Sequence, residues 1–545
     1  MNERLTSFLV AAILFAALRP TAGAAAEAPL PVVPGVRAAV EVTALDLDVV
    51  VTKNGTFVND LRKEDFVVKV DGKAVPLDYF TKVEEGQLFG PDLSNASPDL
   101  ILDTYKASSG DRYLARQFLL FFDDEHMMPF DRPRAIEGAR DLVTRLSPSD
   151  QAALISYNRG SSRVLVPFTN SKESLFDGLS RLGNVAPGGL TWDSSFQQSR
   201  REALAARTTA GRESAIRVWS QQVDAREKSV LADLRRAVSA LAARSGKRTF
   251  LYISSGLELR PGQSFAQAVS PRLLQQFEYT VIPEYETVVR EANSSGVTMY
   301  ALDARGLATD VDAGEALPTV FNRFFVDANR REAMAGFAAE TGGDLFENRN
   351  RFKTAVDQVV REASSFYSVG VTLSNLPKKE AHKIDVAVTR AGVTVRTRRG
   401  FVPKSAEKAT LDRMEMALLT PDARGDFPVE LSIGAPKPGG AGRRLSPFEV
   451  RIPVSALTFR DVNGRKEASF ELSIAAVEDT GARSEPTLER KTISIDAAAW
   501  DPAKAPFYIF AGEAKSRKGN HRFVATVKDV ATNRFGIGSA SARID

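Results

Sequence analysis

The stretch that decides the fold is residues 116–128, which read RQFLLFFDDEHMM. An unbroken apolar run, Phe118–Phe122, is followed at once by three acids and a histidine at residues 123–126. A short apolar run bounded by polar residues predicts a strand that is buried on both faces of a sheet. Because ligands of open α/β sheets bind beyond the carboxyl ends of the strands, the acids stand where a cation would be held.

Downstream of this strand, apolar runs alternate with helical patterns. The predicted strands and helices are, in chain order, Phe118–Asp123, Arg132–Leu146, Ala152–Asn158, Arg163–Phe168, Lys172–Leu182, Arg248–Ser254, Val297–Asp303, Arg330–Thr341 and Phe352–Phe366. Most of the strands lack alternation of apolar and polar residues, which is typical of a sheet covered on both faces. The pattern predicts a doubly wound, mostly parallel α/β sheet of the Rossmann type over residues 113–367.

One helical insertion, residues 194–245, interrupts this order. Its pattern breaks near Gly211 and then places apolar residues on one helix face. These residues are Ile216, Trp219, Val223, Val230, Leu234, Val238 and Leu241. The opposite face is rich in Arg and Lys. Two interpretations are open: a helix that covers the sheet and exposes a solvated basic face, or a lid or docking helix beside the acidic tip.

β-rich segments flank the α/β region on both sides. Residues 38–84 carry Asn-Gly and Asp-Gly turn signals between apolar runs and predict a small β domain. Residues 368–403 form a further β segment that pairs with, or packs on, the α/β domain or the N-terminal β domain. After a connecting helix, strand patterns recur at short spacing over residues 427–545 and predict a β-sandwich domain.

The N-terminus predicts export. An apolar run at Phe8–Leu18 is followed by small residues that suit cleavage, so we interpret residues 1–26 as a signal peptide rather than as a buried helix. No later stretch approaches the roughly 20 apolar residues that a membrane span requires. The mature protein is therefore expected in the periplasm, on the outer surface or in the medium, with no transmembrane span.

Composition and motifs narrow the function classes. The 545-residue chain has a net charge of +4 and no cysteine, which argues against a nucleic-acid partner, disulfides and thiolate chemistry. The sequence has no Gly-x-Ser-x-Gly elbow and no Gly-rich phosphate loop. Its three scattered histidines offer neither a zinc cluster nor a catalytic triad. These observations predict a protein that is not an enzyme.

The α/β region resembles a von Willebrand factor A (VWA) domain, and residues 38–402 are similar in layout to exported VWA-related proteins common in acidobacteria. The segments that carry the resemblance read VVVTKNGTFVNDLRKEDFVVKV, FLLFFDDEH, LSPSDQAALISYN, MYALDARGL and MAGFAAETGGDLFENRN. VWA domains hold a divalent cation at a metal-ion-dependent adhesion site (MIDAS). Its pattern is Asp-x-Ser-x-Ser after the first strand, a Thr from a second loop and an Asp from a third.

Carried over to this chain, the resemblance places Asp123 at the first Asp and Thr191 at the Thr. Glu125 and Met127 stand at the two Ser positions, and Ser255 stands where the last Asp is expected. A thioether is a poor ligand for a hard cation. The resemblance therefore implies a degenerate site. Its candidate ligands for Mg²⁺ or another divalent cation are Asp123, Glu125 and Thr191, and the alternative is a site that binds no cation.

Three hypotheses for the strand tip stay open. The candidate ligands, with Asp124, hold a cation in a changed geometry; the domain binds partners through its loops without a metal; or the acids face solvent or Arg side chains. The predicted function is a non-enzymatic protein-binding or adhesion protein for a protein or cell-surface ligand. The alternatives are a metal-assisted hydrolase at Asp123 and Glu125, and a structural envelope component.

Overall fold

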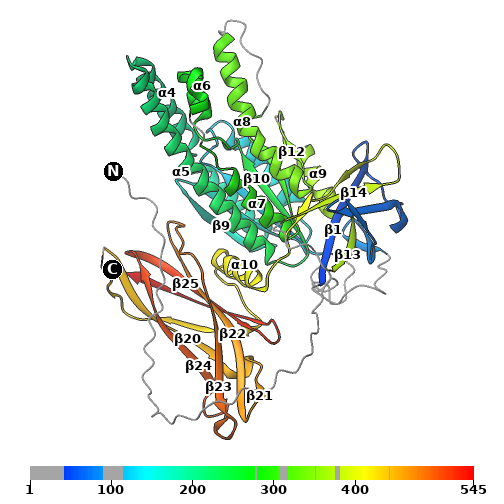
Figure 1. The fold of residues 1–545 in the computed structure, drawn as a ribbon, viewed down its shortest axis with the longest axis vertical. Coiled ribbons are helices and arrows are strands. Elements are labelled where there is room, and N and C mark those ends of the chain that lie inside the picture. Colours follow the sequence, from blue (N-terminus) through cyan, green and yellow to red (C-terminus); the bar gives the residue numbers. More distant parts are fainter. Residues whose placement is uncertain are drawn as a thin grey trace, which may run out of the picture.

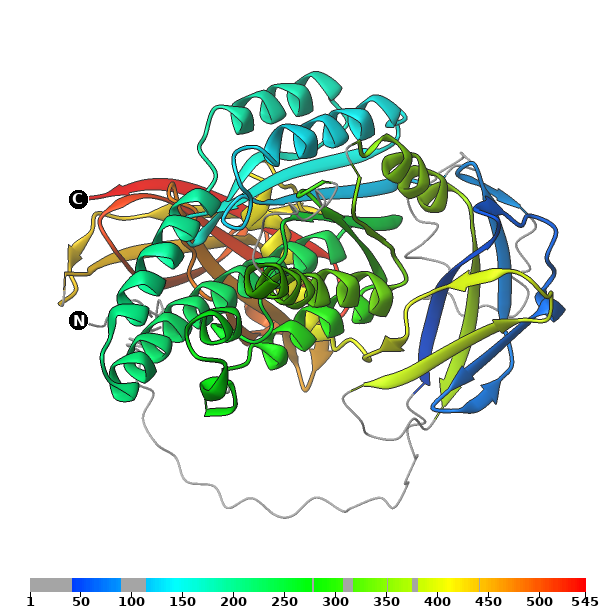
Figure 2. The ribbon, with the colours of Figure 1, turned by 90° about the horizontal axis from the view of Figure 1, so that it is seen from above.

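The computed structural model describes residues 42–89, 114–276, 279–306, 317–349, 351–374, 381–440 and 442–545. A helix-covered sheet lies at the centre of the fold, between two units built of strands (Figure 1). Figure 2 shows these two β units at opposite ends of the molecule. The predicted signal peptide, residues 1–26, lies outside the described residues. None of the described helices is long and apolar enough to cross a membrane.

The central sheet has the strand order β12-β11-β10-β7-β8-β9. Its strands are β7(Arg116–Asp123), β8(Gln151–Asn158), β9(Ser161–Thr169), β10(Lys247–Ser254), β11(Val297–Asp303) and β12(Leu345–Phe346). Neighbouring strands are parallel except β8 and β9, which are antiparallel. All eight residues of β7 are buried. Residues 116–123 therefore form an inner strand of a mixed, mostly parallel sheet.

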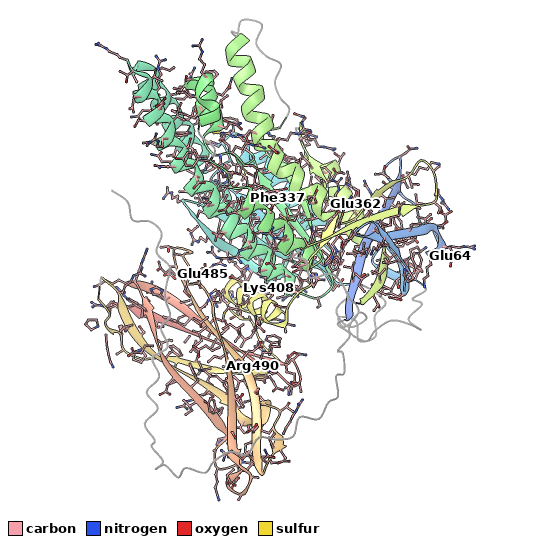
Figure 3. The ribbon with its side chains drawn as sticks, in the orientation of Figure 1. Glu64, Phe337, Glu362, Lys408, Glu485 and Arg490 are labelled. Carbon is pink, nitrogen blue, oxygen red and sulfur yellow. The ribbon has the colours of Figure 1, made fainter. Side chains whose placement is uncertain are left out.

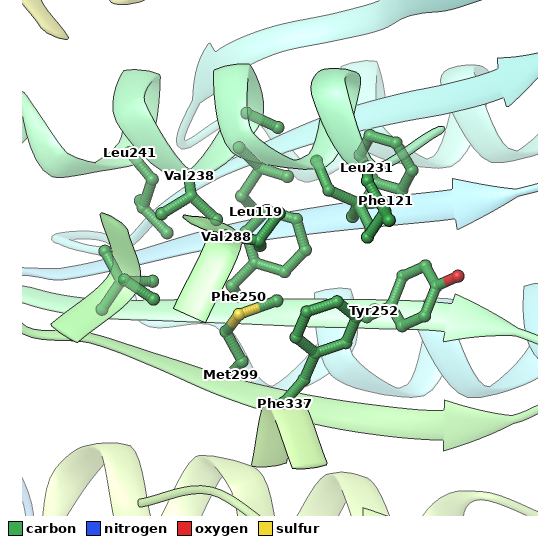
Figure 4. Close-up of a cluster of buried hydrophobic side chains, with 14 of the residues drawn as sticks. Leu119, Phe121, Leu231, Val238, Leu241, Phe250, Tyr252, Val288, Met299 and Phe337 are labelled. Carbon is green, nitrogen blue, oxygen red and sulfur yellow. The ribbon is translucent and has the colours of Figure 1, made fainter. Parts of the chain in front are cut away.

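Helices cover both faces of this sheet. Successive side chains of a strand point to opposite faces, so the apolar strands present side chains to the helices on each side. The helices are α2(Arg132–Arg145), α3(Lys172–Gly183), α5(Thr209–Ala242), α7(Ile282–Ser294), α8(Leu317–Thr341) and α9(Lys353–Ser364). Leu119 and Phe121 pack with α5, α7 and α8, and Figure 4 shows this cluster with Leu231 of α5. Phe118 and Leu120 pack with α2, α3 and α9 on the other face.

The predicted insertion is a pair of helices, α4(Gly189–Ala205) and α5, against which α6(Gln263–Val269) packs. α4 begins at Gly189, before the predicted start at 194. The chain breaks between the helices at residues 206–208 rather than near Gly211. The reason is a helix cap: the side chain of Thr208 accepts a hydrogen bond from the backbone N–H of Gly211 at 3.1 Å.

The N-terminal β unit combines strands from before and after the central sheet. Its strands are β1(Val42–Lys53), β2(Thr56–Phe57), β3(Phe66–Val70), β4(Lys73–Val75), β5(Tyr79–Glu84), β6(Gln87–Phe89), β13(Phe366–Ser374), β14(His382–Val388), β15(Thr394–Arg396) and β16(Gly400–Phe401). One sheet has the order β15-β1-β13-β5-β6, with β2 on β1, and the other has the order β16-β14-β3-β4. The segment 368–403 thus pairs with the N-terminal strands, one of the two arrangements left open by its pattern, and shares their core.

The C-terminal β unit also has two sheets around one apolar core. Its strands are β17(Phe427–Pro428), β18(Glu430–Ile433), β19(Lys437–Pro438), β20(Arg444–Pro453), β21(Arg460–Val462), β22(Arg465–Glu478), β23(Thr487–Asp496), β24(Phe507–Ser516), β25(Gly519–Asp529) and β26(Phe535–Ile544). The first sheet has the order β17-β26-β25-β22-β21, with β23 on β22. The second has the order β18-β20-β19, with β24 on β20.

One helix, α10(Ala406–Leu419), joins the C-terminal β unit to the central sheet. Met416 and Leu419 belong to the apolar core under α5 and α7. Met414 and Leu418 pack instead on the C-terminal strands, against Val524. Figure 3 shows Lys408 of α10 between the two units. Because α10 is buried on both sides, it fixes the position of one unit relative to the other.

Candidate functional site

The candidate site lies at the carboxyl end of β7, where Asp123 is completely buried. The hydroxyls of Tyr252 and Ser254 donate hydrogen bonds to one carboxylate oxygen at 2.6 and 2.9 Å. The ring nitrogen Nδ1 of His126 lies 2.7 and 2.8 Å from the two oxygens. Burial alone would raise the pKa of Asp123, but the charge of His126 and these hydrogen bonds hold that pKa below its usual value.

His126 joins the strand tip to α5. Its Nε2 lies 3.0 Å from the carboxylate of Glu227 and 3.1 Å from Nε of Arg226. The two contacts conflict, because a nitrogen that donates to Glu227 cannot accept from Arg226. Burial and Arg226 lower the pKa of His126, but Asp123 and Glu227 outweigh them and raise it to about 9. We therefore assign a proton to both ring nitrogens, so that a buried imidazolium bridges two carboxylates.

Asp124 points away from this network, as expected for neighbouring residues of a strand. Arg132 of α2 places Nε 3.1 Å from its carboxylate, and the hydroxyl of Ser156 donates to it at 2.5 Å. Burial raises the pKa of Asp124 to about 6, against the opposing effects of Arg132 and Ser156. Asp124 therefore ties β7 to α2 and β8, and it does not share a reaction centre with Asp123.

Glu125 holds the start of α4. Its carboxylate accepts a hydrogen bond from the indole N–H of Trp192 at 2.5 Å and another from the backbone N–H of Arg159. Thr191, which precedes Trp192 in the first turn of α4, is exposed. Glu125 therefore has a positioning role for α4 in this structure.

The three candidate ligands, Asp123, Glu125 and Thr191, do not fit a shared cation. Ligand oxygens must converge on one point, at about 2.0–2.1 Å for Mg²⁺. Here no hydrogen bond joins any two of the three residues, and each carboxylate is engaged by other donors. The residue ranges that the structure describes contain no group of three or more His, Cys, Asp or Glu residues arranged to hold a metal ion.

The position of the third MIDAS loop holds a second polar cluster. The hydroxyl of Ser255 lies 3.5 Å from the carboxylate of Asp131, which is also 2.7 Å from Arg134. Burial raises the pKa of Asp131 to about 6. Next to it, Asp303 accepts a hydrogen bond from the guanidinium of Arg305 at 2.7 Å. Each of these acids is thus paired with an arginine two or three residues after it in the chain.

Sequence reasoning missed Glu227 and Tyr252. Glu227 lies on the apolar stripe of α5, four residues after Val223 and three before Val230. A lone acid on such a stripe signals a buried partner. Tyr252 stands two residues before Ser254 and therefore on the same face of β10. Both signals were present in the sequence.

Met127 is buried at the position of the second MIDAS serine, and its backbone sets how closely α4 approaches. Its carbonyl accepts a hydrogen bond from the N–H of Gly189 at 3.1 Å. A Cβ atom at Gly189 would lie 2.3 Å from that carbonyl oxygen. Only glycine allows this contact between the strand-end loop and the first residue of α4.

Gly189→Ala is therefore expected to lower the free energy of unfolding by about 1–3 kcal/mol, as for other overpacked sites. Urea denaturation of the two proteins measures this difference. Gly183→Ala is the matched control, because its Cβ would meet only the side chain of Ile136, at 3.8 Å. Equal stabilities of the two variants would show that α4 does not depend on the contact with Met127.

No family model and no curated protein matches this sequence. Solved structures similar to the chain include the pilus adhesin SpaC of Lactobacillus rhamnosus GG, at 8% identity and a TM-score of 0.29 over 79% of this chain and 57% of the adhesin. A von Willebrand factor type A protein of Catenulispora acidiphila is 11% identical, with a TM-score of 0.22 over 92% of this chain and 73% of its own.

Manganese-loaded TRAP protein of Plasmodium vivax is 10% identical, with a TM-score of 0.20 over 52% of this chain and 93% of its own. The chain spans little more than half the length of the adhesin. Proteins of the VWA class are thus among the structures similar to this chain, at identities and scores that assign no function.

Proposed function

We propose that this chain is an exported protein that binds other proteins through the strand-end face of a VWA-like α/β unit and has no enzymatic activity. The observation that carries the proposal is a group of large apolar side chains exposed at that end, on two loops and on the first turn of α4. Phe130 is 67% exposed, Val185 is 48% exposed and Leu190 is 53% exposed. Exposed apolar side chains that gather on one face are typical of protein-interaction surfaces.

Phe130 and Val185 belong to two loops and Leu190 to the first turn of α4, and these segments are fixed against each other. The guanidinium of Arg132 donates a hydrogen bond to the carbonyl of Val185. The backbone hydrogen bond between Gly189 and Met127 joins the start of α4 to the loop after β7. The surface is therefore preorganised, which reduces the entropy lost when a partner binds.

The acids at the strand tip support this surface from beneath. Asp123 and His126 anchor α5, Asp124 anchors α2, and Glu125 anchors α4. Side chains that already hold three helices are not free to coordinate a partner through a cation. Recognition in this proposal is thus independent of a divalent metal.

Affinity capture from envelope extracts tests the proposal, with the mature chain, a Phe130→Asp/Leu190→Asp variant and a Val462→Asp control. Val462 is also exposed but lies on β21 of the C-terminal unit. We expect the mature chain and the Val462→Asp control to retain a partner, in EDTA and in Mg²⁺ alike. The Phe130→Asp/Leu190→Asp variant should not retain it. An unchanged set of retained proteins in the double variant would refute the assignment of this face.

Divalent cations are expected to leave the melting temperature unchanged. A cation present at a hundred times its Kd that bound only the folded protein would add about 2.7 kcal/mol of stability, which is visible as a higher melting temperature. The measurement compares melting curves in EDTA with curves in Mg²⁺, Mn²⁺ or Ca²⁺. A rise in melting temperature with any of these cations would contradict the expectation. Thr191→Ala shows whether the rise depends on the candidate ligand Thr191, which is exposed, so that its replacement is expected to leave the fold intact.

A further inference from the structure

The distal end of the α4–α5 helix pair projects beyond the central sheet. α5 has 34 residues, so it is about 51 Å long, whereas the eight residues of β10 span about 26 Å. Ser220 of α5 lies against Gly262 in the loop after β10. The residues of α5 before Ser220 therefore extend past the strand ends, together with the carboxyl-terminal half of α4 (Figure 1).

The two helices leave a groove between them at this distal end. Its volume is about 310 Å³, and Ala203, Ala215 and Trp219 form its apolar wall. The ring of Trp219 is fixed from behind, stacked on Phe265 at 5.2 Å between centroids and edge-on to Phe196 at 5.6 Å. The groove is thus a rigid, concave and partly apolar surface.

Two large apolar side chains are exposed beside the groove. Leu204 of α4 is 44% exposed, and Val218 of α5, which lines the groove, is 51% exposed. A helix pair that only covered the sheet would be expected to present polar side chains at its outer end. Exposed apolar groups next to a preformed groove are the usual features of a site that accepts side chains of a partner.

The same end carries an excess of positive charge. Residues 198–219 contain five arginines and two glutamates. The arginines are Arg200, Arg201, Arg207, Arg212 and Arg217. None of the five has an ion pair or a side-chain hydrogen bond within the part of the chain that the structure describes, and the Nε atoms of Arg200 and Arg212 are buried without a partner.

The proximal part of α5 provides an internal comparison. There Lys228 lies 3.0 Å from Asp224, Arg236 contacts Asp233, and Arg226 lies 3.6 Å from Glu227. Three of the four cations in this part of α5 thus have an ion pair, Arg235 being the exception, whereas neither Arg212 nor Arg217 has one in the part of the helix that projects into solvent. The groove itself is lined by one acid, Glu202, and by none of the five arginines. The unpaired guanidinium groups on the same two helices outnumber the acids there, and they complement a ligand that carries carboxylates.

We propose that the distal end of the α4–α5 pair is a second binding surface, and that it takes an acidic amphipathic helix of a partner protein. The apolar residues of that helix enter the groove beside Trp219, and its carboxylates meet the arginines at the rim. A concave groove between two helices suits an inserted side chain, whereas a membrane-binding helix presents a convex apolar face. The surface is separate from the strand-end face around Phe130.

The probe is a labelled synthetic helix with Leu at positions i, i+3, i+4 and i+7 and Glu at most other positions, titrated into the full chain. We expect saturable binding that weakens as salt rises and that is lost when Lys replaces Glu in the peptide. Arg207→Glu/Arg217→Glu is expected to weaken binding about tenfold or more, because each contact of a guanidinium with a carboxylate is lost. Val218→Asp should weaken it as well.

The matched control is Arg460→Glu/Arg490→Glu, which makes the same change of charge on exposed residues of the C-terminal unit. Its affinity for the peptide should stay within about twofold of the unmodified chain, and so should that of Phe130→Asp. Failure of the acidic peptide to bind, or equal binding by the distal and control variants, would overturn the proposal. So would binding to phosphatidylglycerol vesicles in place of the peptide, or self-association through this surface in light scattering.

Discussion

His126→Ala is expected to lower the free energy of unfolding by about 3–5 kcal/mol, the range found when one member of a buried ion pair is removed. The imidazole of His126 separates the carboxylates of Asp123 and Glu227, and all three side chains are buried. Without it, two negative charges are left in a space closed to water. Urea denaturation near neutral pH measures the loss.

The control for this substitution is His521→Ala. His521 is also buried, but its Nε2 faces the backbone carbonyl of Arg517 at 2.9 Å. Losing a neutral hydrogen bond costs about 1 kcal/mol, apart from the packing that both variants lose. The double variant His126→Ala/Glu227→Gln should lose less than the sum of its single changes, because the second change removes a buried charge that has lost its closest cationic partner, with only Arg226 left at 3.6 Å. Strict additivity would show that the two residues do not interact.

The same ion pair makes stability depend on pH. The pKa of His126 rises from 6.5 to about 9 on folding, so its contribution is complete below about pH 6.5 and is lost as the pH rises through about 9. At 1.36 kcal/mol for each unit of pKa, the contribution is about 3 kcal/mol. The stability difference between the unmodified chain and His126→Ala should therefore narrow over this interval. A constant difference would indicate a neutral imidazole that accepts from Arg226.

Several elements could be predicted because their burial leaves a local pattern. Residues 118–122 are apolar at every position because both faces of β7 are covered. This pattern can be recognised without knowing which strands lie on either side. The pairing of residues 368–403 is different. A strand pattern shows which side chains are buried but not which strand provides the hydrogen bonds, and β13 pairs with β1, more than 300 residues earlier.

The place of Asp123 at the end of β7 could be predicted from the sequence, but its hydrogen-bond partners could not. Asp123 could be identified because it ends an apolar strand, yet its principal partner network includes Glu227, 101 residues after His126. No spacing rule links two residues so far apart. The start of α4 was placed too late because Gly188 and Gly189 are poor helix formers. They are required there by the close approach of Glu125 and Met127, which is a tertiary constraint.

Lys408→Met is expected to lower the free energy of unfolding by about 2–3 kcal/mol and to loosen the C-terminal β unit from the central sheet. The ammonium group of Lys408 lies 2.7 Å from Glu291 of α7 and 2.9 Å from Asp412 of α10. Both acids are buried. Burial and the nearby Asp412 already raise the pKa of Glu291. Asp412 keeps its contact with Lys404 when Lys408 is removed, so the change leaves Glu291 as the buried carboxylate without its ion-pair partner.

The stability lost in Lys408→Met should exceed that of a single ion pair, because α10 packs on both units. Its Met416 and Leu419 belong to the apolar cluster that includes α5 and α7, and its Met414 and Leu418 pack on the C-terminal strands. A displacement of α10 therefore acts on both units together. Calorimetry should show a single transition in the unmodified chain, and in Lys408→Met an earlier transition in which one unit unfolds before the other.

Lys383→Met provides the comparison, because Lys383 pairs at 3.4 Å with an exposed carboxylate, that of Asp385. An exposed pair contributes about 0–1 kcal/mol, so this variant should melt as one transition close to the unmodified chain. If Lys408→Met behaves in the same way, the two units are held by apolar packing of α10 alone. If Lys408→Met splits the transition in two, the buried cation couples the central α/β unit to the C-terminal β unit. The strand-end face and the C-terminal unit then move as one body only while Lys408 is in place.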